Sequence, residues 1–180
     1  MTRFLNGKKI YLAGLTKKDC RGRYLEMVND AENLTFVEGI GYHPVYPFDL
    51  ERYIKSNDDR SSLLLGIFEK STDAHVGNIH LSRISPHHRY CSYGIIMHKK
   101  YMGRGYACEA SKILIKHAFE KMNMHRIEIT SVADNKKATK LYKKLGAVEE
   151  GRKREAFYSK GKYRDLVIFS ILNKGLGNEH

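Results

Sequence analysis

The chain has 180 residues, of which 42% are hydrophobic and 11% aromatic, and its formal net charge is +12. This length fits one domain with its own core, and the composition excludes disordered, collagen-like and repeat proteins. No stretch approaches the roughly 20 apolar residues of a membrane-spanning helix, and charge comes too early at the N-terminus for a secretory signal. We therefore expect one cytoplasmic domain over residues 1–174, with a short tail at 175–180 and no membrane partner.

The positive charge is spread along the chain rather than gathered in one run. A basic excess attracts polyanions, but no zinc finger, helix-turn-helix or aromatic RNA-binding motif accompanies it, so no specific nucleic-acid partner is expected. The three cysteines, Cys20, Cys91 and Cys108, stand far apart, and the nine histidines form no HExxH or Cys-His cluster. We therefore predict neither a disulfide framework nor a metal site.

The predicted elements alternate between strands and helices along the chain. Short apolar or alternating runs predict strands at 9–13, 63–69, 75–84, 90–97, 126–132, 148–158 and 163–172. Three- and four-residue spacing and capping residues predict helices at 17–29, 50–56, 105–122 and 135–145. The strands at 63–97 look like an antiparallel meander, and the whole order indicates an α/β fold with a mixed sheet.

One segment with chemical potential lies where the strand at 90–97 leads through a glycine-bearing loop into a long helix. A helix start leaves backbone N–H groups unpaired and carries positive partial charge, so it suits a phosphate group. Gly103 and Gly105 keep side chains away from the backbone there, and Lys100 and Arg104 add counter-charge. The loop fits a diphosphate cradle, and equally a plain strand-to-helix turn, whereas its spacing does not match a nucleotide-hydrolysing P-loop.

A second segment is the helix predicted at 135–145. Asn135 suits the N-cap and Gly146 the left-handed position after the helix. Tyr142 follows Asn135 by seven residues, so both project toward the same side about two turns apart. A tyrosine on an apolar stripe ordinarily packs and hydrogen-bonds its hydroxyl, so this pattern alone gives Tyr142 no chemical role.

Taken together, the two segments resemble the cofactor motifs of the GNAT superfamily of N-acetyltransferases. The first, Lys100-x-x-Gly103-x-Gly105-x-Ala107, is similar to its diphosphate loop, with Lys100 where Gln or Arg is usual. The second, Asn135-x-x-Ala138-x-x-Leu141-Tyr142-x-x-Leu145-Gly146, is similar to its second cofactor-contacting helix. Their order matches as well, and the resemblance extends to the branch of ribosomal-protein N-terminal and small-amine acetyltransferases.

The resemblance implies a GNAT-like mixed sheet of six to seven strands, flanked by helices on both faces, and acetyl-CoA (coenzyme A) as the cofactor. The parallel strands at 90–97 and 126–132 would splay apart and receive the pantetheine arm against their backbone. The expected cofactor-binding residues are Ile95, Ile96, Met97, Lys100, Met102, Gly103, Arg104, Gly105, Tyr106, Ala107, Asn135, Ala138 and Tyr142.

The same resemblance implies an acyltransferase in which a free primary amine attacks the thioester directly, without an acyl-enzyme. An N–H near Met97 would stabilise the oxyanion, and Tyr142 would protonate the departing thiolate as general acid. Relatives often place a carboxylate near Ser92, so the general base is open. The candidates for it are Glu128, His98, His80, and Ser92 with an ordered water.

The acceptor is expected between residues 28–53 and the hairpin near 159–163, as in relatives of this fold. The candidate substrate-binding residues are Asn29, Phe36, Tyr42, His80 and Ser92. The basic surplus favours a small amine that carries phosphate, such as a nucleotide-linked amino sugar, over a cationic polyamine. The N-terminus of a protein such as a ribosomal protein, and a non-catalytic basic binding module on the same fold, stay as alternatives. A homodimer is also left open.

Overall fold

The computed structural model describes residues 2–37, 42–57 and 60–174, so the predicted tail at 175–180 lies outside it. Within these ranges eight strands form one sheet in the order β1-β2-β3-β4-β5-β6-β8-β7. The strands are β1 (Leu5–Asn6), β2 (Ile10–Gly14), β3 (Leu63–Glu69), β4 (His75–Ser85), β5 (Tyr90–Met97), β6 (Arg126–Val132), β7 (Val148–Ser159) and β8 (Lys162–Leu172). The helices are α1 (Arg23–Asn29), α2 (Pro47–Ser56), α3 (Tyr106–Glu120) and α4 (Lys136–Lys144), with 3-10 turns η1 (Lys17–Cys20) and η2 (Lys99–Tyr101).

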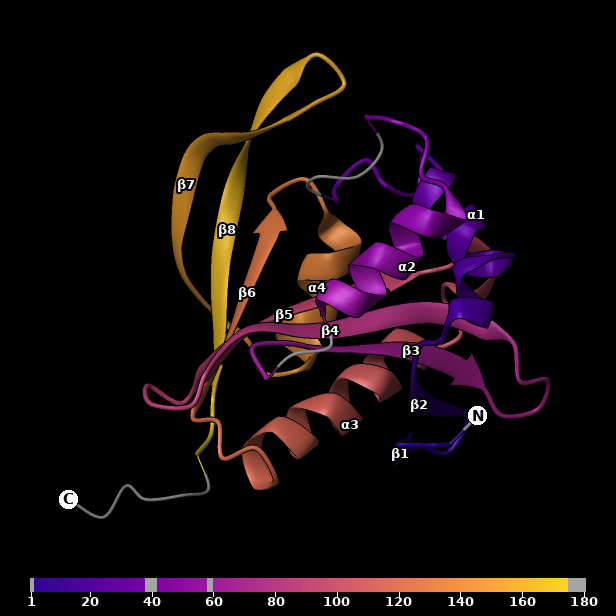
Figure 1. Ribbon diagram of the computed structural model, residues 1–180. Helices are drawn as coiled ribbons and strands as arrows, with labels where there is room; N and C mark the ends of the chain where they lie inside the picture. The colour runs from indigo at the N-terminus through magenta and orange to yellow at the C-terminus, as the bar shows by residue number, and fades with distance from the viewer. Residues whose placement is uncertain (1, 38–41, 58–59, 175–180) are drawn as a thin grey trace.

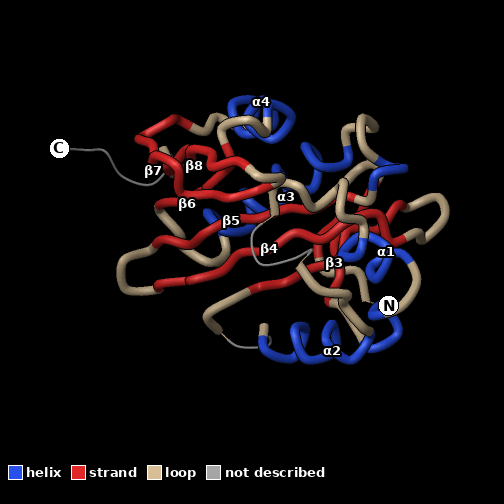
Figure 2. The backbone as a smooth tube through the Cα atoms, turned by 90° about the horizontal axis from the view of Figure 1, so that it is seen from above, coloured by secondary structure: helices blue, strands red, loops and turns tan. Residues whose placement is uncertain are grey.

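The sheet is the middle layer of the molecule (Figure 1). Helices α3 and α4 lie on one of its faces, and α1 and α2 lie on the other (Figure 2). The predicted α/β fold with a mixed, helix-flanked sheet is therefore confirmed. None of the helices in the described ranges is long and apolar enough to cross a membrane.

The N-terminal third differs from the sequence prediction in two places, one predicted helix that is wrong and one strand that was missed. The helix expected at 17–29 is interrupted at Gly22, whose positive φ of 58° separates the turn η1 from α1. Such a backbone conformation suits glycine and stops helix propagation. The strand β1 was not predicted, because it pairs with β2 through only Leu5 and Asn6 and has no repeating pattern of its own. It is the strand that brings the sheet to eight.

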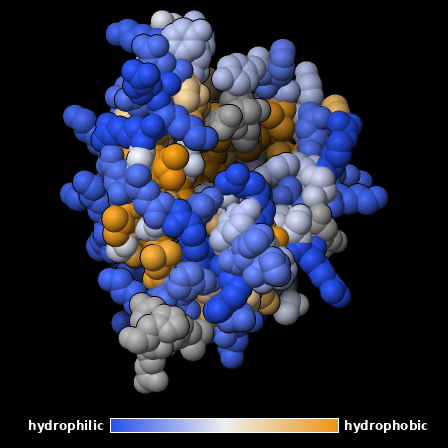
Figure 3. Space-filling model, turned by 90° about the vertical axis from the view of Figure 1, so that its left-hand side faces the viewer, coloured by the Kyte–Doolittle hydropathy of each residue, from blue (hydrophilic) through white to orange (hydrophobic). Residues whose placement is uncertain are grey.

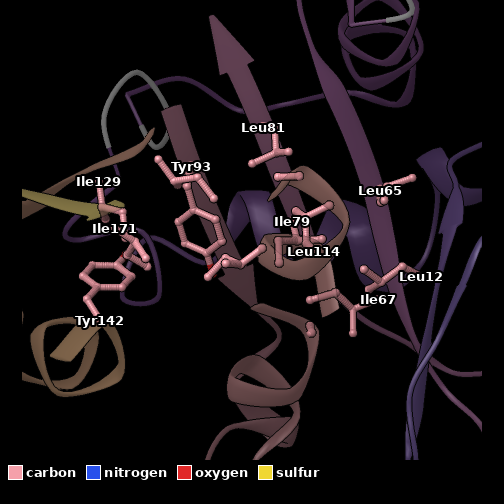
Figure 4. Close-up of a cluster of buried hydrophobic side chains, with 14 of the residues drawn as sticks. Leu12, Leu65, Ile67, Ile79, Leu81, Tyr93, Leu114, Ile129, Tyr142 and Ile171 are labelled. Atoms are coloured by element: carbon pink, nitrogen blue, oxygen red, sulfur yellow. The ribbon is translucent and has the colours of Figure 1, made fainter. Parts of the chain in front are cut away.

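The main core lies between the sheet and the α3–α4 face. Helix α3 buries Tyr106, Ala110, Leu114 and Ala118, four residues at a spacing of four. Burying a large aliphatic or aromatic side chain stabilises the fold by about 1.5–3 kcal/mol. Figure 4 shows the side chains that meet here: Leu12, Leu65, Ile67, Ile79, Leu81, Tyr93, Leu114, Ile129, Tyr142 and Ile171.

The parallel strands β5 and β6 are paired along only part of their length. Their register runs from Tyr90 opposite Arg126 to Tyr93 opposite Ile129 and then stops. Beyond that point β5 stays paired with β4 as far as Met97, and β6 stays paired with β8 as far as Val132. Only the edge that the two strands share opens, as the predicted splay requires.

Candidate active site

The open edge of β5 exposes backbone groups that no neighbouring strand takes up. The N–H of His98 donates to Val76 O at 2.9 Å, on the β4 side. Because successive residues of a strand direct their N–H groups to opposite edges, Met97 and Ile95 direct theirs toward the open side, and Ile96 faces β4. The strand therefore presents two N–H groups to the gap, which can orient an extended arm that bears amides of its own.

The loop after β5 leads into α3 through two glycines with left-handed backbone. Gly103 has a φ of 80° and Gly105, the N-cap of α3, a φ of 84°. A Cβ at either glycine would point into open space, with no heavy atom within 4 Å. The first helical bond runs from Glu109 N to Gly105 O, so the N–H groups of residues 106–108 have no acceptor within the helix. These donors and the helix dipole make the turn a suitable diphosphate cradle.

The other loop residues predicted to bind the cofactor surround this turn. Lys100 is exposed and, in the described part of the chain, has no ion pair, while Met102 is 43% exposed. The guanidinium of Arg104 is not free, because it lies 3.6 Å from Glu69 and stacks 4.9 Å above the Tyr101 ring. The remaining two, Tyr106 and Ala107, form the first turn of α3.

The helix α4 begins at the same edge of the sheet, since it follows β6 as α3 follows β5. Asn135 caps it, with its side-chain oxygen accepting from Ala138 N at 3.1 Å. Gly146 has the left-handed φ of 85° expected after the helix. Both predicted caps are confirmed, and Asn135 therefore has a structural task in addition to any contact with a cofactor.

Tyr142 is almost fully buried on the apolar side of α4, 7% exposed (Figure 4). Its ring meets Tyr93 edge-on, with centroids 6.1 Å apart, and tilts against Phe169. Burial raises the pKa of its hydroxyl to about 12. Among the described residues no hydrogen bond of this hydroxyl is present, whereas the hydroxyl of Tyr93 bonds Ser111 Oγ at 2.6 Å. Tyr142 is thus a protonated, uncommitted donor beside the gap.

His98 is placed differently from a free base. Its ring is 6% exposed, Nδ1 accepts from Lys100 N at 3.2 Å, and Nε2 lies 3.2 Å from Glu26 Oε2. Because Nδ1 accepts a hydrogen bond, Nε2 carries the ring N–H and donates it to the Glu26 carboxylate. Both ring nitrogens are therefore engaged in holding η2 against α1.

Ser92 and Glu128 lie opposite each other in the β5–β6 register and belong to a polar network. Arg83 donates to Ser92 Oγ at 2.9 Å and lies 3.6 Å from Glu128, which also accepts from Arg126 at 3.0 Å. Arg83 has a positive φ of 50° at an irregularity in the β4–β5 pairing, and such bulges redirect side chains. Arg126 further pairs with Glu150, so the two arginines are balanced by two glutamates.

The other residues predicted to contact the acceptor do not all come together. Asn29 holds the α1–α2 connection, because its side chain donates to Val45 O at 2.8 Å and accepts from Val45 N at 2.9 Å. It also lines a cavity of about 290 Å³ that includes His98. Phe36 is half-buried, and Tyr42 is 68% exposed and outside that cavity.

His80, the last of these residues, lies on β4 opposite Gly94, the first β5 residue beyond the paired part. Gly94 leaves open space where a Cβ would be. The His80 ring stands edge-on to Tyr53, and its Nε2 is buried without a hydrogen-bond partner among the described residues. Desolvation lowers the pKa of His80.

Two contacts near the gap were not predicted from the sequence. Asn33 Nδ2 donates to Met97 O at 3.1 Å, which places the α1–α2 connection against the end of β5. Ser159, in the β7–β8 hairpin, donates to Thr35 O at 2.9 Å and joins the hairpin to the same connection. These partners are 64 and 124 residues apart, and no local pattern marks them.

Seen from the β7 side, the surface is mostly hydrophilic, and hydrophobic residues line a hollow in its upper half (Figure 3).

In the described ranges no group of three or more His, Cys, Asp or Glu side chains lies close enough together to hold a metal ion.

Comparison with known proteins agrees with this arrangement. Residues 9–148 match the family model described as acetyltransferase (GNAT) domain. The chain is 31% identical over 98 residues to the putative ribosomal N-acetyltransferase YdaF of Bacillus subtilis, covering 54% of each protein. It is 30% identical over 104 residues to spermidine N(1)-acetyltransferase of Escherichia coli K12, covering 58% of this chain and 56% of the relative. The match thus spans about half the length of these curated relatives.

Solved structures share the fold over nearly the whole chain. A spermidine N-acetyltransferase from Vibrio cholerae, in complex with CoA and spermine, superposes with a TM-score of 0.83 at 24% identity, covering 91% of this chain and 95% of that one. The ribosomal L7/L12 alpha-N-protein acetyltransferase RimL, in complex with coenzyme A, gives 0.82 at 15% identity, covering 91% and 94%. Since the family model matches most of the sequence and the fold agrees throughout, the chain belongs to the acetyltransferase (GNAT) domain family.

Proposed function

We propose that the protein is an acetyl-CoA-dependent N-acetyltransferase that moves an acetyl group to a primary amine by direct attack in a ternary complex. One observation carries the proposal: the edge between β5 and β6 opens beside a turn with two left-handed glycines and beside Tyr142, which packs against the last paired residue of β5. Bound acetyl-CoA supplies the activated acetyl thioester. The chain's own contribution is to orient, polarise and move protons.

The cofactor-binding part follows from the backbone. The N–H groups of residues 103–108, at the start of α3, hold the diphosphate, and the side chain of Lys100 adds charge from the preceding turn. The open edge of β5 orients the arm through Ile95 and Met97. The N–H of Met97 is the donor assigned to the developing oxyanion.

Tyr142 is the proposed general acid. With a pKa of about 12 its hydroxyl remains protonated at neutral pH, and it makes no hydrogen bond to another group of the described residues. In the proposed reaction the departing thiolate of CoA takes up the proton of the Tyr142 hydroxyl. Burial also raises the pKa of Cys91 to about 12, so this thiol stays protonated and is a poor nucleophile. Both features favour direct transfer to the amine.

We assign removal of the amine proton to His80 rather than to His98 or Glu128. Desolvation lowers the pKa of His80, so its ring is neutral near pH 7. Its Nε2 has no competing partner in the described ranges, in contrast to His98, and Glu128 is already paired with two arginines. The route runs past Gly94, where no side chain stands between β4 and the gap.

The acceptor is proposed to be a small amine whose remaining part is neutral or anionic, such as a nucleotide-linked amino sugar. In the paired part of the β5–β6 seam, which leads up to the gap, the ionised groups are balanced, with Arg83 and Arg126 against Glu128 and Glu150. A polyamine would prefer an acidic surplus, which this network does not offer.

The test is an amine panel with acetyl-CoA, read as release of free thiol. It includes nucleotide-linked amino sugars, simple amino sugars, spermidine and peptides with free N-termini. Turnover with the anionic amines supports the acceptor class. Preferential turnover of spermidine or a peptide N-terminus would replace the acceptor but keep the chemistry, and thiol release with no amine at all would remove the transferase assignment.

A further inference from the structure

A buried carboxylate outside the gap has no part in the chemistry described above. Glu69, the last residue of β3, is 8% exposed although it is ionisable. Its carboxylate accepts hydrogen bonds from the Tyr106 hydroxyl and, at 2.6 Å, from Thr72 Oγ1, and Arg104 Nη1 lies 3.6 Å away. These donors hold its pKa below the usual range, with Thr72 contributing most. A buried charge with so many donors is a fixed anchor point.

The two residues that this carboxylate holds, Arg104 in the loop and Tyr106 in α3, lie on either side of Gly105. Gly105 is the left-handed residue at which the loop ends and α3 begins. Arg104 is held further by Tyr101, over whose ring its guanidinium stacks. The β3–β4 turn therefore fixes the residue before and the residue after the bend that shapes the cradle.

We propose that Glu69 is a positioning residue of the diphosphate cradle. It does not touch the cofactor; it holds Arg104 and Tyr106 so that the N–H groups at the start of α3 converge before the ligand arrives. The negative charge of Glu69 is compensated by the Arg104 guanidinium and by two hydroxyl donors. The gain from an ordered cradle therefore exceeds the repulsion between this carboxylate and the diphosphate. The inference rests on the proposed placement of the diphosphate at residues 103–108.

Glu69→Gln tests this role, because it keeps the shape of the side chain and removes its charge. Two acetyl donors are compared: acetyl-CoA, and S-acetylpantetheine, which has the same thioester but no diphosphate. We expect KM for acetyl-CoA to rise on the order of 10-fold with kcat at saturation unchanged, since misplaced binding groups weaken productive binding. The kcat/KM for S-acetylpantetheine should stay at the wild-type value.

Two further variants keep the test decisive. Glu109→Gln is the matched control, because this glutamate also belongs to the first turn of α3 but accepts from Lys9 N at 2.9 Å, away from the cradle. It should change neither donor's kinetics. Tyr106→Phe removes one donor to Glu69 while the ring stays, so a smaller rise in KM for acetyl-CoA alone is expected.

The outcomes separate the two proposals. Equal losses with both donors, or tighter binding of acetyl-CoA by Glu69→Gln, would overturn the role of Glu69. If the wild type prefers acetyl-CoA, and Glu69→Gln and Tyr106→Phe have the same kinetics as the wild type, only the proposed role of Glu69 is refuted and the cradle assignment stands. If the wild type uses the two donors equally well, the cradle assignment fails first and the role of Glu69 falls with it. If Glu69→Gln does not fold, Tyr106→Phe tests the proposal through the same comparison between acetyl-CoA and S-acetylpantetheine.

Discussion

The seam between β5 and β6 contains two regions built from the same strands but used differently. In its paired part, Cys91, Tyr93, Ile127 and Ile129 are at most 6% exposed, and the register is continuous. In its open part, the same strands keep their outer partners and lose each other. Unpaired backbone groups away from water are costly, so the open part is stable where a ligand or solvent takes them up. The open part therefore differs from the paired part in lacking the backbone hydrogen bonds between β5 and β6.

Two tyrosines that touch across this boundary show the same contrast. Tyr93 belongs to the paired part, and its hydroxyl bonds Ser111. Tyr142 packs edge-on against it, and its hydroxyl makes no hydrogen bond within the described residues. Burial raises the pKa of both. The environment of the hydroxyl, rather than that of the ring, separates a structural tyrosine from the proposed acid.

The largest effect is expected from filling the cradle. Gly103→Val places a branched side chain at a φ of 80°, a conformation that such residues rarely adopt, and directs it into the open space proposed for the diphosphate. We expect no measurable binding of CoA by titration calorimetry. Gly14→Val is the control, because Gly14 also has open space around its Cβ position but no positive φ. Normal CoA binding by Gly103→Val would refute the cradle.

Removing the proposed acid comes next in size. Tyr142→Phe keeps the packing against Tyr93 and Phe169 and loses only the hydroxyl. General acid catalysis contributes roughly 10²–10⁴-fold, so we expect kcat to fall by about 100-fold with the affinity for acetyl-CoA nearly unchanged. Steady-state kinetics and CoA titration measure the two quantities. Unaltered turnover would take Tyr142 out of the mechanism.

The sequence predicted those parts of the molecule that depend on local patterns. The strands β3 to β6, the caps Asn135 and Gly146, and the loop glycines follow from spacing, backbone geometry and helix-end chemistry, and all are present. The break at Gly22 could have been suspected from the glycine, but the prediction followed the helix-capping residue Thr16 and continued one helix through it.

What the sequence did not predict depends on distant contacts. The link from Asn33 to Met97 and the arginines around Glu128 join separate elements. His98 was one of the candidate bases because of its residue type, and only the fold brings Glu26 to its Nε2. Glu69 was not singled out, because a glutamate that ends a strand next to a turn has the appearance of an ordinary surface residue until Arg104 and Tyr106 come against it.

Tyr93→Phe separates the structural tyrosine from the chemical one. It leaves the Ser111 hydroxyl without its partner in the core, although that hydroxyl still donates to Ala107 O at 2.6 Å. We expect the free energy of unfolding to fall by about 1 kcal/mol, with kcat unchanged. Urea unfolding and steady-state kinetics are the measurements. A fall in kcat as large as that of Tyr142→Phe would mean that the two tyrosines act together.

The smallest effect is expected at the closed end of the seam, where Arg126 at the start of β6 pairs with Glu150 of β7. Hydrogen bonds from the Arg126 guanidinium and, to a smaller extent, from the Ser170 hydroxyl lower the pKa of Glu150 from 4.5 to about 2. Because the folded-state pKa is depressed, the stabilisation is present above the unfolded value and is lost as pH falls from about 4.5 to about 2. Glu150→Gln should therefore lower Tm at pH 7, by less than about 4 °C because the pair is partly exposed. The difference from the wild type should shrink below pH 4.5, as followed by thermal unfolding across a pH series. A difference that stays constant down to pH 2 would show that Glu150 acts through packing rather than through its charge.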